Sequence, residues 1–349
     1  MSKKPIAVVT GGAGFIGSHM VDRLLQSNYS VRVIDNLVSG RKSNLKHHSK
    51  NPKLSCEWRD ICKLKTNASL FKDAKYIFHF AGIGDLIPSI DNPEKYMTNN
   101  VQGTIRILEC ARRNQIKKLV YAASSSCYGL AKIPTKEKHP INPQYPYALS
   151  KYLGECSAFH WKKIYNLPVN SIRIFNAYGT RVRTTGVYGA VFGVFLKQKL
   201  EGKPFTVVGS GKQKRDFVYA SDVANAFLLA AKTKLVGKIW NLGSGNPQSI
   251  NKLIEILGGD VVHIPKRPGE PNCTYANIAK IKKDLAWKPK IKFKKGVELM
   301  LKEIESWKNA PLWDAKKIEK ATQSWFKYLS LIHISEPTRP RLISYAVFC

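Results

Sequence analysis

One stretch near the start of the chain decides the fold: "PIAVVTGGAGFIGSHMVDRLLQS", residues 5–27. Its apolar beginning predicts a short buried strand, and its amphipathic second half predicts a helix. Gly11, Gly14 and Gly17 lie between them in the pattern GxxGxxG. Glycine permits a tight turn and lets backbone amides approach a pyrophosphate, which then meets the positive end of the helix. A glycine triplet alone could be only a turn, but its place between strand and helix indicates a dinucleotide site.

Apolar stretches of the same kind recur along the first half of the chain. They predict further strands in "YSVRVIDN", "KYIFHFAG" and "KKLVYAAS", at residues 29–36, 75–82 and 117–124. A helical pattern, "EKYMTNNVQGTIRILECARRN", fills residues 94–114. Strands and helices that alternate at this length predict an α/β fold of the Rossmann type, with a doubly wound parallel sheet.

The alternation of predicted strands and helices becomes less regular after "LPVNSIRIFNAYG", residues 167–179, where glycine, proline and loops become more frequent. We therefore expect residues 1–175 to form the dinucleotide-binding domain. Residues 176–328 are expected to form a smaller α/β substrate-binding region that is partly interleaved with the sheet. The final stretch, "LSLIHISEPTRPRLISYAVFC" at residues 329–349, resembles a translated sequencing-library adapter, so we expect read-through there. A genuine apolar C-terminal strand is the alternative.

The formal net charge of +33 indicates either an acidic partner or a lysine-biased composition. Lysines outnumber arginines and are spread along the chain, which favours the compositional explanation and no nucleic-acid partner. A non-catalytic binding protein with a basic interaction surface is the alternative. The seven cysteines lack zinc-site or disulfide spacing, so we expect no metal. No apolar run of about 18 residues and no signal peptide are present, which predicts a cytoplasmic protein without membrane contact.

A carboxylate ends the second predicted strand at Asp35, followed by Asn36. An acid at this place can accept both hydroxyls of an adenosine ribose and would repel a 2′-phosphate, which favours NAD over NADP. A turn or helix-capping role for Asp35 is the lesser alternative. A further strand is expected before the one at residues 75–82, and the stretch "RDI", residues 59–61, ends it, where an adenine could rest.

The candidate chemistry lies in two segments, "SSSCYG" at residues 124–129 and "YALSK" at residues 147–151. Tyr147 and Lys151 are four residues apart, which puts both on one face of the predicted helix. A free tyrosine has a pKa of about 10, and a neighbouring ammonium and a cationic nicotinamide would stabilise its phenolate. Tyr147 is therefore a candidate general base, and Ser124 can hold the substrate oxygen.

With these motifs, the chain resembles the extended short-chain dehydrogenase/reductase family, and within it the NAD-dependent nucleotide-sugar 4-epimerases. The resemblance spans about residues 5–328 and includes "TGGAGFIGSH", "SSSCYG", "YALSK", "FNAYG", "RDFVYASDVANA" and "RPGEP". It implies catalytic roles for Ser124, Tyr147 and Lys151. It also implies NAD contacts, beyond those above, from Phe15, Ile16, Asp60, Ile61, Ala81, Asn99 and Phe175. A homodimer through the helices around residues 99–114 and 147–166 is expected on the same ground.

The resemblance also assigns roles in the second half of the chain. Asn176 would hold the sugar diphosphate, and Arg215 and Arg267 would bind its phosphates, since guanidinium groups suit diphosphate oxygens. Glu270 would take the nucleotide ribose. Thr274 stands where a bulky residue gates the sugar pocket in relatives, which leaves room for a 2-acetamido group. Surface salt bridges are the alternative role for the two arginines.

The residues after Ser124 separate the reactions of this family. Relatives that dehydrate or decarboxylate nucleotide sugars carry acids where this chain has Ser125 and Ser126, and a serine cannot serve as the acid or base of an elimination. We therefore expect 4-epimerisation of a nucleotide-diphosphate sugar by transient oxidation at C4. UDP-glucose or its N-acetylated counterpart is the expected substrate, and a dehydratase, decarboxylase or reductase of the same family is the alternative. A further departure is Gly84, where many relatives have a lysine near the nicotinamide.

Overall fold

The computed structural model describes residues 4–184, 191–266 and 270–329. Two sequence-based expectations concern residues outside these ranges, namely the phosphate-binding role of Arg267 and the nature of residues 330–349. Leu329, the first residue of the final stretch, is buried and ends helix α12 (Gln323–Leu329).

The opening stretch folds as its pattern predicts. Strand β1 (Ile6–Thr10) leads through the glycine turn into helix α1 (Phe15–Gln26). The buried residues of α1 include Met20, Val21 and Leu24, which recur at helical spacing and pack on the sheet. This amphipathic face fixes the helix against the strand that precedes it.

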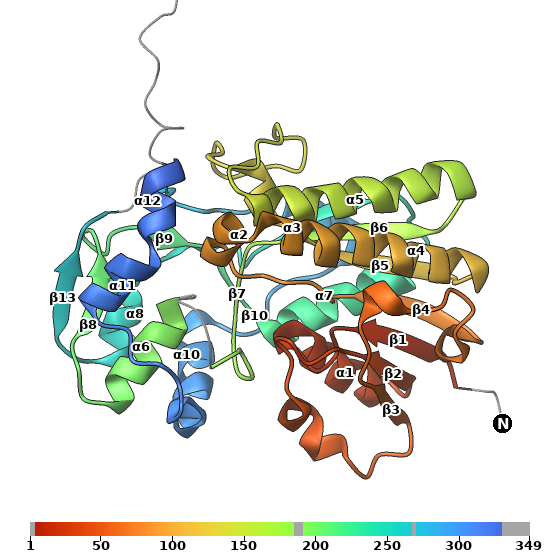
Figure 1. Ribbon diagram of the computed structural model, residues 1–349, viewed down its shortest axis with the longest axis horizontal. Coiled ribbons are helices and arrows are strands. Elements are labelled where there is room, and N and C mark those ends of the chain that lie inside the picture. The colour runs from red at the N-terminus through yellow and green to blue at the C-terminus, as the bar shows by residue number, and fades with distance from the viewer. Residues whose placement is uncertain (1–3, 185–190, 267–269, 330–349) are drawn as a thin grey trace, which may run out of the picture.

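A seven-stranded parallel sheet forms the centre of the larger lobe (Figure 1). Its order is β11-β6-β5-β4-β1-β2-β3, and every neighbouring pair is parallel. The other strands are β2 (Ser30–Ile34), β3 (Leu54–Glu57), β4 (Ala74–His79), β5 (Lys118–Ser124), β6 (Val169–Ile174) and β11 (Ile239–Leu242). The order reverses between β1 and β4, and the run from β3 to β6 is that of a Rossmann sheet, so the predicted fold class is confirmed. Strand β11 lies late in the chain and returns to this sheet.

Helices cover both faces of the sheet because alternate strand residues point to opposite sides. In β5, Val120 and Ala122 belong to the apolar cluster with α1 and α7 (Ala220–Lys232), whereas Leu119, Tyr121 and Ala123 belong to the cluster with α4 (Gly103–Arg113) and α5 (Pro146–Tyr165). The shorter helices of this lobe are α2 (Ile87–Asp91), α3 (Pro93–Tyr96), the π-helical turn η4 (Met97–Gln102) and α9 (Ala279–Leu285). Short 3₁₀ turns are η1 (Lys42–His48), η2 (Ile61–Lys63), η3 (Ser69–Phe71) and η5 (Ser125–Tyr128).

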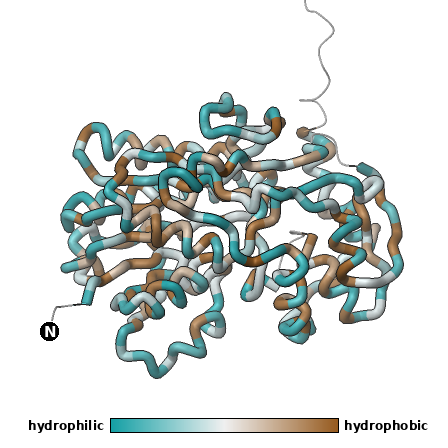
Figure 2. Tube along the Cα trace, turned by 180° about the vertical axis from the view of Figure 1, so that it is seen from behind, coloured by the Kyte–Doolittle hydropathy of each residue, from teal (hydrophilic) through white to brown (hydrophobic). Residues whose placement is uncertain are grey.

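The smaller lobe combines short strands and helices around a separate apolar core (Figure 1). Its strand pairs are β7 (Asn176–Tyr178) with β10 (Phe217–Tyr219), β9 (Lys214–Arg215) with β12 (Gln248–Ser249), and β8 (Phe205–Val208) with β13 (Val261–Ile264). Its helical elements are α6 (Val191–Leu200), α8 (Ile250–Leu257), α10 (Phe293–Lys302), η6 (Ile304–Trp307), α11 (Ala315–Ala321) and α12. Hydrophilic residues dominate the outer loops of both lobes, and apolar segments run through their interiors (Figure 2). None of the helices in the described part of the chain has the length and apolar character needed to cross a membrane.

Candidate active site

The glycine turn has the geometry that an anion-binding loop requires. Gly11 has a φ of +69°, which favours glycine, and its amide donates to the carbonyl of Ile34 at 2.7 Å. A Cβ on Gly17 would lie 2.0 Å from the carbonyl oxygen of Gly11, so only glycine fits there. Helix α1 begins at Phe15, and its N-cap residue Gly14 has no side chain to cap it, which leaves the first amides of the helix directed at the turn. A dinucleotide pyrophosphate therefore fits this cradle.

Asp35 lies directly beside the glycine turn. Its two carboxylate oxygens accept hydrogen bonds from the amide of Ala13 at 3.0 Å and from the amide of Leu37 at 2.8 Å. Burial raises the pKa of Asp35, and these backbone bonds oppose that shift. The carboxylate thus helps to shape the turn, and its remaining lone pairs can still accept ribose hydroxyls.

The other predicted cofactor residues lie around the same edge of the sheet or on the loops next to it. The Ala81 amide donates to the Thr10 hydroxyl at 3.3 Å, and its backbone packs against Gly11. The Asp60 carboxylate caps the turn η2, and Ile61 packs on Gly103 of α4. Asn36 is exposed, Asn99 lies on η4, Phe15 and Ile16 open α1, and the amide of Phe175 bonds to Leu242.

The structure brings Ser124 and Tyr147 together. Ser124 ends β5 and Tyr147 lies in the first turn of α5, and the Ser124 hydroxyl lies near enough to the Tyr147 phenol to lower its pKa. The Ser124 hydroxyl also donates to the Ser126 hydroxyl at 3.0 Å. Burial raises the pKa of Tyr147 in the chain by itself, and the interaction with Ser124 opposes this shift, whereas the expected stabilisation of the phenolate also requires a cationic nicotinamide. The half-buried phenol is desolvated, an effect that neighbouring charges alone do not describe.

Lys151 lies one turn further along α5 and is buried. Burial lowers its pKa to about 8, and the charge of Glu155 opposes that shift. The Lys151 Nζ atom lies 4.6 Å from the centroid of the Tyr121 ring, and the Tyr121 hydroxyl donates to the Lys151 carbonyl at 3.0 Å. An ammonium is therefore held inside the lobe within two turns of the candidate base.

Two charged residues near this site, Asp85 and Arg183, belong to none of the motifs that the sequence shows. Asp85, in the loop after β4, is half-buried, and its charge raises the pKa of both Tyr147 and Tyr96. Burial raises the pKa of Asp85 itself, opposed by Arg183, whose Nη1 atom lies 3.5 Å from an Asp85 oxygen. The signal for Asp85 was an isolated acid in an otherwise uncharged loop, and Arg183 gave none because it lies about a hundred residues further along the chain.

A third missed residue is Asn100, which follows the predicted Asn99. Its side chain bonds the amide and carbonyl of Ile83 at 2.8 Å and 3.0 Å and the Ser150 hydroxyl at 2.9 Å. It thereby ties the loop after β4 to helix α5. It lies on the π-helical turn η4, a type of distortion that often accompanies functional sites.

The predicted substrate residues in the second half form two pairs. Arg215 makes an ion pair with Glu270 at 2.6 Å and donates to the Pro271 carbonyl. The Thr274 hydroxyl donates to the Asn176 side-chain oxygen at 2.6 Å. Ion pairing is the alternative role that the sequence analysis left open for Arg215, and the pairing with Glu270 also preorients its guanidinium.

One group of metal-ligand type occurs among the described residues, namely Asp22, His47 and His48. Both imidazole Nε2 atoms lie 2.8 Å from the same oxygen of Asp22, and Arg181 donates to the other oxygen at 2.7 Å. The group therefore forms a hydrogen-bonded cluster that ties α1 and η1 to the loop after β7.

A Rossmann sheet with a serine, a tyrosine and a lysine at its carboxyl edge is the arrangement of short-chain dehydrogenases and reductases. Comparison with known sequences identifies the family within this class of enzymes. Residues 7–243 match the NAD dependent epimerase/dehydratase family, and the chain belongs to that family. NAD is accordingly its cofactor, in keeping with the fit of the glycine turn.

Three similar proteins illustrate the family. A protein of Methanocaldococcus jannaschii assigned as a UDP-glucose 4-epimerase is 38% identical over 309 residues, covering 86% of this chain and 97% of the relative. The structure of a UDP-N-acetylglucosamine 4-epimerase from Methanobrevibacter ruminantium, in complex with UDP-N-acetylmuramic acid, superposes with a TM-score of 0.83 at 31% identity, covering 87% and 99%. The structure of the UDP-glucuronic acid 4-epimerase of Bacillus cereus, in complex with UDP-glucuronic acid and NAD, superposes with a TM-score of 0.81 at 29% identity. The match covers 86% of this chain and 99% of that protein.

Proposed function

We propose that this protein is an NAD-dependent 4-epimerase of UDP-sugars. The observation that carries the proposal is the placement of Ser124, at the end of β5, near the Tyr147 phenol, with Lys151 buried on the next turn of α5. The names of similar proteins support the same reaction class, since the three above are all designated 4-epimerases of UDP-sugars.

In the proposed mechanism, Tyr147, Ser124 and Lys151 each have a separate role. Tyr147 takes the proton of the sugar 4-hydroxyl and later returns a proton to the 4-keto oxygen. Ser124 holds the same oxygen by its hydroxyl and shortens the path of the proton. The Lys151 ammonium stabilises the phenolate electrostatically. The glycine turn and Asp35 would hold NAD, which would supply the hydride acceptor and donor needed for oxidation and re-reduction at C4.

Elimination chemistry is disfavoured by the residues next to Ser124. Ser125 and Ser126 occupy the turn η5, and Ser126 accepts from Ser124 and bonds Tyr145. Neither can act as the acid or base that removes water or carbon dioxide from a sugar. The products of the proposed reaction therefore have the same mass as the substrate.

We assign the substrate anchor to Asn176, Arg215, Arg267 and Glu270, which would hold the nucleotide and its diphosphate while the keto sugar turns over. The pairs Arg215–Glu270 and Thr274–Asn176 support this assignment because they draw the substrate-half residues toward β7 and β9. Thr274 is small, so a 2-acetamido group is admissible beside a 2-hydroxyl.

The test incubates the full chain with UDP-glucose, UDP-N-acetylglucosamine or UDP-glucuronate and follows the anomeric proton by NMR. A second anomeric signal at unchanged mass supports 4-epimerisation and identifies the preferred sugar. A product that has lost water or carbon dioxide would instead establish the dehydratase or decarboxylase alternative. NAD binding without any conversion would contradict the proposal for these substrates.

A homodimer through α4 and α5 is part of the proposal. Leu149, Leu153 and Ile164 lie on one face of α5 and are 37%, 36% and 53% exposed. An exposed apolar stripe of this kind fits a helix of a second copy. Light scattering should give twice the chain mass, and Leu153→Glu should give a monomer; a monomeric parent chain would contradict the dimer.

The cytoplasm is the proposed location. All six cysteines in the described ranges are free thiols, as expected in a reducing compartment. Cell fractionation that recovered the protein outside the cytoplasm would contradict this part of the proposal.

A further inference from the structure

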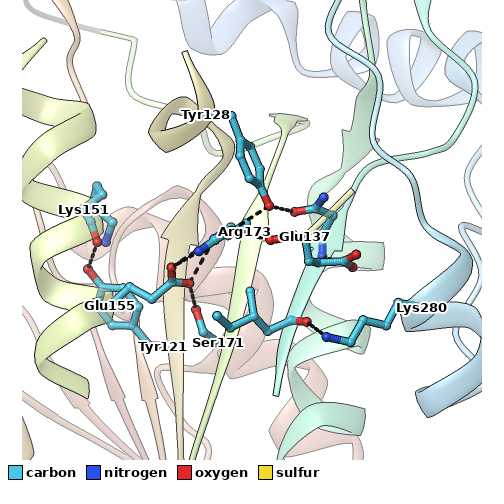
Figure 3. Close-up of polar contacts among 10 residues, drawn as sticks. Tyr121, Tyr128, Glu137, Lys151, Glu155, Ser171, Arg173 and Lys280 are labelled. Carbon is cyan, nitrogen blue, oxygen red and sulfur yellow. Dashed lines mark hydrogen bonds and ion pairs between the residues drawn. The ribbon is translucent and has the colours of Figure 1, made fainter. Parts of the chain in front are cut away.

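Tyr121 contacts Lys151 at two points. Its ring lies under the ammonium, with 4.6 Å between the Nζ atom and the ring centroid, and its hydroxyl donates to the Lys151 carbonyl at 3.0 Å. Figure 3 shows this hydroxyl directed at the backbone of α5. We propose that Tyr121 is a positioning residue for Lys151, holding both its helix turn and its charge. The inference rests on the proposed function, in which Lys151 assists Tyr147.

The sheet fixes the place of Tyr121. It lies three residues before Ser124 on β5, and strand alternation directs it to the face covered by α4 and α5. Its side chain is fully buried, so the ring cannot leave the ammonium without opening the core. The same strand therefore carries the candidate serine at its end and the support of the candidate lysine just inside.

Helix α5 is shaped to accept this ring. A Cβ on Gly154 would lie 2.3 Å from the Tyr121 hydroxyl and 3.2 Å from the Asn100 carbonyl oxygen. Glycine is a poor residue for a helix interior, yet it stands in the middle of this 20-residue helix. Its absence of a side chain admits Tyr121, which is a second observation that the contact is built into the fold.

The other titratable groups around Lys151 do not replace the contact of its ammonium with the Tyr121 ring. Glu155 raises the pKa of Lys151, but its own carboxylate is engaged by Arg173 at 2.6 Å and by the Ser171 hydroxyl. His79 of β4 is neutral at neutral pH, because burial and the Lys151 charge lower its pKa to about 3. Burial raises the pKa of Tyr147, so the phenolate that serves as the base needs a positive charge nearby.

A π face suits the proposed role better than a direct salt bridge would. The negative face of an aromatic ring stabilises a desolvated cation without neutralising it. The charge of Lys151 then remains able to act on the phenolate that forms at Tyr147. Loss of the ring leaves the ammonium buried with less compensation, so its pKa should fall.

The test measures the titration of Lys151 directly, in protein whose lysines carry ¹³C at Cε. Free lysines titrate near 10.4, and the Lys151 signal is the one that Lys151→Arg removes. Tyr121→Met, which fills the space without a π face, should lower the Lys151 pKa by roughly half a unit to one unit. Tyr121→Phe keeps the ring and should leave the pKa almost unchanged.

Two further variants keep the test decisive. Gly154→Ala displaces the Tyr121 ring without altering it and should also lower the Lys151 pKa, which replaces Tyr121→Met if that variant does not fold. Phe78→Leu, a buried aromatic change on the opposite face of β4, should reduce stability and leave the Lys151 titration in place.

The alkaline limb of the epimerisation pH profile should move with the titration. An unchanged Lys151 pKa in both Tyr121→Met and Gly154→Ala would overturn the inference. A second outcome separates the two proposals. If the Lys151 pKa shifts in the variants but the parent chain epimerises none of the three UDP-sugars, the positioning role is upheld and the proposed function is contradicted.

Discussion

Glu155 and Arg173 form a buried ion pair behind the candidate active site, with 2.6 Å between a carboxylate oxygen and Nη2. Their side chains are 3% and 5% exposed. Arg173 also donates to the Tyr128 hydroxyl at 2.8 Å, and that hydroxyl donates to Asn241 of β11 (Figure 3). The pair therefore connects the helix that carries Lys151 with strands β6 and β11 and with the turn η5.

Glu155→Gln should destabilise the protein by about 3 kcal/mol, because the Arg173 charge would remain buried without its counter-ion. The same change should lower the pKa of Lys151, since the Glu155 charge raises it. Urea unfolding at neutral pH measures the first effect. Glu298→Gln, which removes an exposed partner of Lys295, serves as the control and should leave stability almost unchanged. A loss below about 1 kcal/mol for Glu155→Gln would show that the pair is not structural.

Tyr147→Phe should lower kcat by at least about a hundredfold, because it removes the group that exchanges the proton of the sugar hydroxyl. NAD binding should persist, since the glycine turn is untouched. Tyr145→Phe is the matched comparison, as Tyr145 stacks beside Tyr147 with ring centroids 6.4 Å apart and bonds Ser126. Equal losses in the two variants would argue against a special role for the Tyr147 hydroxyl.

Asp85→Asn should shift the acidic limb of the kcat/KM profile to lower pH. The Asp85 carboxylate raises the pKa of Tyr147, since a negative charge disfavours a nearby phenolate. Without it, the basic form of Tyr147 is populated at lower pH and activity rises earlier. Asp91→Asn, on the neighbouring helix α2, retains Asp85 and should leave the limb in place. A shift to higher pH in Asp85→Asn would contradict the assignment of Tyr147 as the base.

His79→Asn should flatten the loss of stability in acid. Burial is the main cause that lowers the pKa of His79 from 6.5 to about 3 in the folded protein, while the unfolded chain keeps its ordinary value. Between these two values the unfolded chain binds a proton that the folded protein refuses, so stability falls as pH decreases. One such histidine accounts for about 2 kcal/mol between pH 6.5 and pH 5.

The measurement compares urea unfolding of parent and His79→Asn at pH 7 and pH 5. The variant should be less stable at pH 7, because the bonds of His79 to Thr10 and Thr104 are lost, but it should lose less on acidification. His263→Asn, at an exposed position on β13, should retain the parent slope. Parallel pH dependence in parent and His79→Asn would contradict the buried, neutral state of this histidine.

The parts of the fold that sequence reasoning predicted are those governed by local rules. The glycine turn, the strands at β1, β2, β4 and β5, and the pairing of Tyr147 with Lys151 along one helix follow from backbone freedom, alternation and helical spacing. Residues 94–114, where the sequence predicts a helix, are also helical. The π-helical turn η4 interrupts this helix, and the residue spacing did not predict it.

Other features depend on segments that are far apart in the chain. Tyr121 supports Lys151 only because β5 and α5 pack together, and Asp85 meets Arg183 only because the loop after β4 lies beside the loop after β7. Arg215 and Glu270, assigned separately to phosphate and ribose, pair with each other.

The candidate base Tyr147 also depends partly on the sequence and partly on the tertiary structure. Its residue type and its spacing from Lys151 are properties of the sequence, and they single out this helix as the candidate site. The direction of its pKa shift is set by burial, which exists only once β5, α5 and the surrounding loops have excluded water. Local backbone preferences thus determine which elements form and which side chains share a face, whereas desolvation and long-range charge pairing arise only from the packed tertiary structure.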